Sequence, residues 1–88
     1  MSLDEEIIIY FSNNTGVVKE NINRNSMFGD DLGMDSLDMV ETALYIEDKY
    51  HINLPVDEFD RMSNVGHVID YVAKYRGGVD VDNSARKK

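Results

Sequence analysis

One serine in this chain lies where a phosphate-linked group would be stabilised. Ser36 follows Gly33 and Asp35, so a turn at the glycine and a cap at the aspartate would place the serine in the first turn of a helix. Backbone N–H groups at a helix N-terminus lack partners within the helix and carry partial positive charge. A phosphodiester on the Ser36 hydroxyl would therefore be favoured. An ordinary serine near a helix start fits the same spacing, so the spacing alone leaves both interpretations open.

Two carboxylates flank this serine. Asp35 is the expected helix cap and Asp38 lies in the first turn, where acidic side chains suit the helix dipole. Both would repel a phosphate on Ser36, so we expect them to serve another role. Contact with a cationic partner, or with a metal ion that such a partner holds, is the natural candidate.

Catalysis by Ser36 is not expected. A serine hydrolase places its nucleophile in a Gly-x-Ser-x-Gly turn and pairs it with a base. Gly33 stands three residues before the serine rather than two, and Asp38 occupies the place of the second glycine. The only histidines, His51 and His67, are distant in sequence. We therefore predict no catalytic residue.

A resident metal site is not expected either. A calcium-binding hand requires Asp-x-Asp-x-Asp-Gly with a glutamate at the twelfth position, and the segment 30–33 does not supply it. Two scattered histidines and no cysteine argue against zinc. Loose binding of divalent cations by surface carboxylates stays open.

Acidic charge is concentrated in the middle of the chain. The net charge is −8, and residues 30–60 contain ten acidic side chains against a single basic one, Lys49. Nucleic acid and anionic membranes would be repelled by such a surface, whereas basic proteins would be attracted. A purely solubilising role for the charge is the alternative.

The hydrophobic pattern predicts helices. Ser2 and Glu5 form a capping box ahead of apolar residues at helical spacing, although 7–11 could also form a strand. A long loop then covers 17–35, held by five apolar residues that we expect to point inward: Val18, Ile22, Met27, Phe28 and Leu32. We expect a second helix over 36–50, a short third helix over 56–61, and a last helix that is capped by Ser63 or Asn64 and stopped by Gly77-Gly78.

The predicted fold is therefore all-α: a small four-helix bundle of three main helices and a short third helix, with a long loop between the first and second. Residues 1–78 would form one domain and 79–88 a disordered tail.

No apolar run reaches the roughly 20 residues of a membrane span. Asp4, Glu5 and Glu6 stand where a signal peptide would be basic. We expect a monomer in the cytoplasm, or in an organelle matrix if a targeting segment has been removed.

The stretch from Phe28 to Val72 resembles the acyl carrier protein family. The motif Asp35-Ser36-Leu37 after Leu32-Gly33 is similar to that family's attachment site, and an acidic helix follows it. A weaker similarity extends back into the first helix, so that the resemblance covers roughly residues 3–75.

The resemblance implies that a phosphopantetheinyl transferase attaches a 4′-phosphopantetheine arm from coenzyme A to Ser36. Acyl groups would then be carried as thioesters on the arm's thiol. It also implies a partner-binding surface on the second helix for acyl transferases, synthases and other basic-surfaced enzymes of the pathway. Its residues would be Asp35, Leu37, Asp38, Val40, Glu41, Leu44, Glu47 and Asp48.

Several alternatives stay open at this stage. Leu37, Val40 and Leu44 could instead pack in the core. The pathway could be fatty acid or related lipid synthesis, or a specialised polyketide or aminoacyl pathway, and an acidic helical adaptor without cargo is the rival class. Thr15 and Thr42 stand where the resemblance leads us to expect larger apolar residues, which leaves the chain length of the cargo open.

Overall fold

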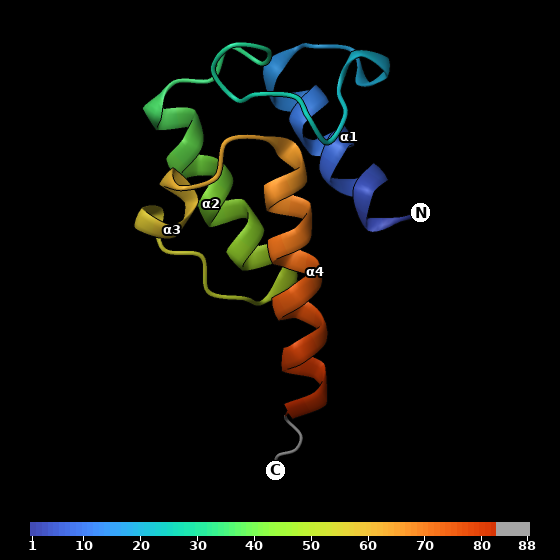
Figure 1. Cartoon of the computed structure of the whole chain (residues 1–88), viewed down its shortest axis with the longest axis vertical. Coiled ribbons are helices and arrows are strands. Elements are labelled where there is room, and N and C mark those ends of the chain that lie inside the picture. The colour runs from blue at the N-terminus through green and yellow to red at the C-terminus, as the bar shows by residue number, and fades with distance from the viewer. Residues whose placement is uncertain (83–88) are drawn as a thin grey trace.

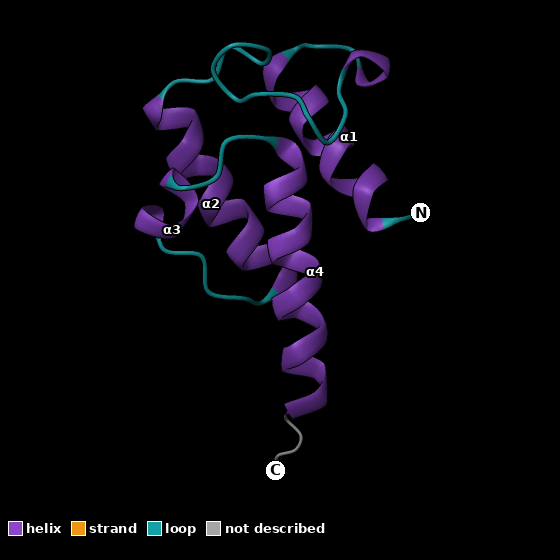
Figure 2. Cartoon of the chain, viewed as in Figure 1, coloured by secondary structure: helices purple, strands orange, loops and turns teal. Residues whose placement is uncertain are grey.

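The computed structural model describes residues 1–82, in which helices are joined by loops (Figure 1, Figure 2). The sequence-based prediction of an all-α bundle with one short helix is confirmed. The elements in chain order are α1 (Leu3–Thr15), the single 3₁₀ turn η1 (Lys19–Asn21), α2 (Ser36–Tyr50), α3 (Val56–Asp60) and α4 (Val65–Asp82). Within 1–82 there is no strand, only one isolated antiparallel bridge between Met27 and Asn64.

The first helix begins and ends where the sequence predicts. Ser2 Oγ accepts a hydrogen bond from the Glu5 N–H at 3.1 Å, and Glu5 Oε1 accepts one from the Ser2 N–H at 3.0 Å. This reciprocal pair satisfies two amide groups at the helix start. Gly16 ends the helix in the left-handed conformation with φ of 82°, which glycine adopts without a steric penalty.

The core lies where α1, α2 and α4 meet, and α3 closes one side of it beside α2 (Figure 1). Every α-helix contributes at least one side chain that is almost completely removed from solvent. The largest of these are Phe11, Phe59, Ile7, Ile46, Val65, Val68 and Val72, and Leu54 in the segment between α2 and α3 is buried to the same degree. Burial of apolar area on this scale is the main source of stability in a chain without disulfides.

The long α1–α2 connection crosses one end of the bundle (Figure 1). Ile22, Phe28 and Leu32 are buried as expected, but the prediction was wrong for two residues, because Val18 is 55% and Met27 is 38% exposed. The η1 turn directs Val18 outward, and Val17 packs against the core instead. Which of the apolar side chains face inward depends on the path of the loop in the folded protein. Apolar character alone does not specify that path.

The last helix is longer than predicted. Asn64 Oδ1 accepts the His67 N–H at 3.0 Å, so Asn64 rather than Ser63 provides the cap. The expected stop at Gly77-Gly78 was wrong, because α4 continues through both glycines to Asp82. Glycine in a helix costs roughly 1 kcal/mol relative to alanine, which weakens a helix without forbidding it. Residues 79–82, which we predicted to belong to a disordered tail, are therefore part of α4. The rest of that predicted tail, 83–88, lies outside the described residues.

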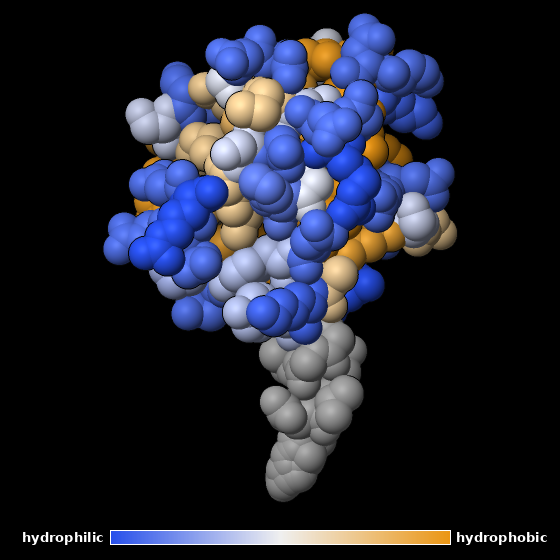
Figure 3. Space-filling model, viewed as in Figure 1, coloured by the Kyte–Doolittle hydropathy of each residue, from blue (hydrophilic) through white to orange (hydrophobic). Residues whose placement is uncertain are grey.

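Within residues 1–82, none of the helices has the length and apolar character that a membrane span requires. Hydrophilic side chains cover most of the face shown in Figure 3, with apolar areas between them.

Candidate functional site

Ser36 is the first residue of α2 and is exposed to solvent. Its hydroxyl and its N–H make no hydrogen bond to any other residue in the part of the chain that the structure describes. The hydroxyl is therefore free to react, and the adjacent helix N-terminus favours negative charge.

The turn before Ser36 is held by its own backbone. The N–H groups of Leu32 and Gly33 donate to the carbonyls of Met27 and Gly29, each at 3.1 Å. Gly33 has a φ of 67°, a left-handed conformation that favours glycine. The Met34 N–H then donates to the Phe28 carbonyl at 3.0 Å. Because Phe28 is anchored in the core, this chain of bonds fixes the point at which α2 begins.

Asp35 and Asp38 hold the start of α2 together. Asp35 Oδ1 accepts the Asp38 N–H at 3.0 Å, and Asp38 Oδ2 accepts the Asp35 N–H at 3.1 Å. This capping box gives both flanking carboxylates a structural role that sequence reasoning missed for Asp38. The sequence signal was present, because an acidic residue stands three positions after the cap.

The outer face of α2 carries the three apolar side chains singled out from the sequence. Leu37 is 65% exposed, Leu44 is 60% exposed and Val40 is 37% exposed. Glu41 and Asp48 are exposed on the same helix, and Asp38 is half-buried. The structure thus places apolar and acidic groups together on a helix that starts at Ser36.

Glu47 differs from the other residues predicted on this surface. Its Oε2 accepts the Leu54 N–H at 2.6 Å, and the side chain is half-buried. The carboxylate therefore holds the segment that connects α2 to α3. Its position on the helix surface is similar to that of its neighbours, so only the tertiary structure reveals this contact.

Comparison with known proteins tests the resemblance on which these expectations depend. A family model described as a phosphopantetheine attachment site matches residues 5–72. An acyl carrier protein of Chlorobium phaeobacteroides is 35% identical over 72 residues, which cover 82% of this chain and 92% of the relative. One of Chloroherpeton thalassium is 44% identical over 59 residues, covering 67% and 74% respectively. The chain belongs to the acyl carrier protein family.

Acyl carrier proteins bear a covalent 4′-phosphopantetheine group, act as carriers rather than as catalysts, and work with the enzymes of their pathway. The residues around Ser36 fit this group. An exposed, unbonded hydroxyl is available for the covalent link, and the first amide group of α2 beside it is unpartnered among the described residues. Within 1–82 no three histidine, cysteine, aspartate or glutamate side chains cluster as metal ligands would.

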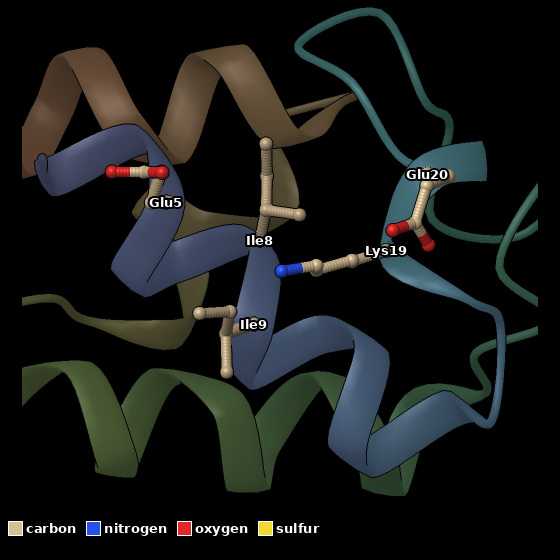
Figure 4. Close-up of a pocket in the computed structure, with 5 residues that line it drawn as sticks. All are labelled: Glu5, Ile8, Ile9, Lys19 and Glu20. Atoms are coloured by element: carbon tan, nitrogen blue, oxygen red, sulfur yellow. The ribbon is translucent and has the colours of Figure 1, made fainter. Parts of the chain in front are cut away.

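Open grooves also lie on the surface of the protein. One of them, with a volume of about 260 Å³, is lined by Glu5, Ile8 and Ile9 of α1 and by Lys19 and Glu20 of η1. Figure 4 shows the Lys19 ammonium group reaching toward Ile8 and Ile9. No residue of α2 lines this groove, so it is separate from Ser36.

The capping box predicts a measurable acid response. The hydrogen bond from the Asp38 N–H to the carboxylate lowers the pKa of Asp35 below its usual 3.8. A group with a lowered folded-state pKa stabilises the fold above its unfolded pKa, and this stabilisation is lost as the pH falls through the folded value. We expect an NMR titration to place the pKa of Asp35 below 3.8 and the Asp35→Asn variant to lose less stability than wild type on acidification below about pH 4. A pKa at or above 3.8 would contradict the role of Asp35 as a charged cap.

Proposed function

We propose that Ser36 is the residue to which 4′-phosphopantetheine is attached, and that the chain carries acyl groups without catalysing any step itself. The observation that supports this most strongly is the exposed, unbonded Ser36 hydroxyl at the start of α2. It lies inside the segment that matches the phosphopantetheine attachment family.

The attachment reaction uses one group of this chain. The Ser36 Oγ forms a bond to the phosphorus that carries the pantetheine portion of coenzyme A. The bond from that phosphorus to the adenosine 3′,5′-bisphosphate portion breaks, and the serine proton is taken up by the transferase or by water. Once attached, the arm supplies the thiol that the cysteine-free chain lacks.

Incubation with coenzyme A and a phosphopantetheinyl transferase tests the proposal. We expect intact-mass analysis to show a gain of one phosphopantetheine group per chain. An unmodified chain beside a control carrier that is fully modified would contradict the proposal.

We propose the outer face of α2 as the surface that partner enzymes bind. Leu37, Val40 and Leu44 would supply apolar contact, and the acidic residues Asp35, Asp38, Glu41 and Asp48 would meet arginine and lysine side chains of the transferase, acyl transferases and synthases. The carboxylates of Asp35 and Asp38 also accept N–H groups, but they are kept because they lie beside Ser36, where the transferase must bind. Glu47 is left out because it lies near the other end of α2 and its carboxylate binds the Leu54 N–H. Rim charges mainly speed and orient encounter, which suits a protein that must bind and leave repeatedly.

Charge reversal at Glu41 should slow loading by the transferase. Glu41 is exposed on α2, and loss of an attractive charge lowers the association rate, by up to about tenfold at low salt. We expect kcat/KM for the Glu41→Lys variant to fall at low ionic strength and to approach the wild-type value at high salt, because screening weakens the attraction.

Glu20→Lys is the matched control, because Glu20 is also exposed but lies on η1. The net charge changes equally in both variants. Equal losses in both variants would show that only the total charge matters and would contradict the assignment of this surface to α2.

Among pathways, we propose fatty acid or related lipid synthesis by separate enzymes, because a strongly acidic recognition helix suits a carrier that diffuses between partners. Mass spectrometry of protein isolated from its native cell would identify the attached group, and a polyketide or aminoacyl group would favour the alternative pathways.

We place the chain in the cytoplasm or an organelle matrix, where coenzyme A and such enzymes occur together.

A further inference from the structure

A small hollow lies between α1 and α2 beside the proposed attachment residue. Met34 and Asp38, each two residues from Ser36, both line it. The remaining lining residues come from α1 and from the next turn of α2: Tyr10, Phe11, Asn14, Thr15, Glu41 and Thr42. Its volume is about 10 Å³, which is the space that about one water molecule requires.

The lining of this hollow is mainly polar. Phe11 and Met34 are its only wholly apolar residues. Thr42 is 2% exposed, and its Oγ1 accepts a hydrogen bond from the Tyr10 hydroxyl at 3.4 Å. Burial raises the pKa of Tyr10 above its usual value, so this hydroxyl stays protonated and remains a donor.

The Tyr10 side chain is held in place by a second aromatic ring. Its ring stacks on that of Tyr45, with 4.0 Å between the ring centroids and 13° between the planes. Because Tyr45 belongs to α2 and Tyr10 to α1, the stack and the Tyr10–Thr42 bond join the two helices at neighbouring points. Together they close the space between the helices.

An alkyl chain that entered here would break this hydrogen bond. It would separate the Tyr10 and Thr42 hydroxyls and leave Thr42, which has almost no access to water, without a partner. A buried hydroxyl without a hydrogen bond costs about 1–3 kcal/mol.

We infer, on the basis of the proposed function, that Tyr10 and Thr42 are specificity-determining residues that close the interior between α1 and α2 to long alkyl chains. An acyl group that this carrier shelters between α1 and α2 is therefore short or has oxygen atoms along its chain. A long saturated chain would stay outside the bundle.

The test compares octanoyl arms in wild type and in a variant without the two hydroxyls. Each protein is loaded from octanoyl-coenzyme A by a transferase that accepts acylated coenzyme A, intact mass verifies the loading, and the Tm is compared with that of the same protein bearing an unacylated arm. We expect no rise in wild type. The Tyr10→Phe/Thr42→Val variant keeps the side-chain shapes but removes the polar lining, and its Tm should rise by roughly 4 °C or more, because a few buried methylene groups suffice for that.

Tyr45→Phe is the matched control, because it removes a hydroxyl from the same stacked pair but does not line the hollow. We expect its Tm, like that of wild type, to show no rise when the arm carries an octanoyl group. A comparable octanoyl-dependent rise in wild type would overturn the inference. An absence of any rise in the double variant would overturn the assignment to Tyr10 and Thr42. Failure of every protein to accept an arm is a different outcome, which would overturn the proposed function and with it this inference.

Discussion

The Ser36→Ala variant should gain no phosphopantetheine, whereas wild type gains one group per chain. The substitution removes the only atom proposed to form the bond to phosphorus, so the loss should be complete. The fold should persist, because the Ser36 side chain is exposed and makes no hydrogen bond within residues 1–82, and alanine is a good helix former. Substitutions of this kind usually change the stability by less than about 0.5 kcal/mol. Intact mass after incubation with the transferase, together with a thermal unfolding curve, measures both expectations.

Ser63→Ala is the matched control for this experiment, because Ser63 is also an exposed serine but lies before α4. It should be modified as fully as wild type. Continued modification of the Ser36→Ala variant would assign the arm to another residue and contradict the proposal.

The Phe28→Ala variant should lose most of its stability. Phe28 is buried, and its ring lies 5.6 Å from that of Phe11 and 5.5 Å from that of Phe59, between centroids. Truncation of a buried phenylalanine costs roughly 3–5 kcal/mol, a large part of the 5–15 kcal/mol that stabilises a typical domain. For a chain of this size the Tm should fall by more than roughly 12 °C. Thermal unfolding followed by circular dichroism measures this change.

The same variant also tests how the site is positioned. The Phe28 carbonyl accepts the Met34 N–H two residues before Ser36, so loss of the ring should loosen the start of α2 and slow modification even at temperatures at which the chain is folded. Tyr75→Ala is the control, because Tyr75 is 42% exposed on α4, and its truncation should change the Tm far less. Equal effects of the two truncations would contradict the role of Phe28 as an anchor.

The helix starts could be predicted from the sequence because capping is a local interaction. Ser2 with Glu5 and Asp35 at the cap of α2 are recognisable from residues three positions apart. The position of Ser36 at the helix start follows from the same cap, but its proposed role as the attachment residue came from the family resemblance, because the spacing alone also fits an ordinary serine. The later end of α4 was missed because glycine is only a weak stop signal when no left-handed turn follows.

The contacts that could not be predicted join residues distant in sequence. Tyr10 and Thr42 are 32 positions apart, and Arg24 binds Asp4 and Asp70 across the bundle. Glu47 resembles its exposed neighbours in sequence, yet its carboxylate faces the Leu54 N–H. Such pairings depend on how the helices pack, and no pattern within a single helix specifies them.

The most direct test of the central claim is to locate the arm by peptide mass spectrometry after modification with coenzyme A and a transferase. Cleavage after arginine and lysine releases residues 25–49 as one peptide, which contains both Ser26 and Ser36. Ser26 is buried and Ser36 is exposed, so fragmentation should place the whole phosphopantetheine signal on Ser36. Phosphopantetheine on Ser26 or on any other residue, or a peptide without the group, would contradict the claim.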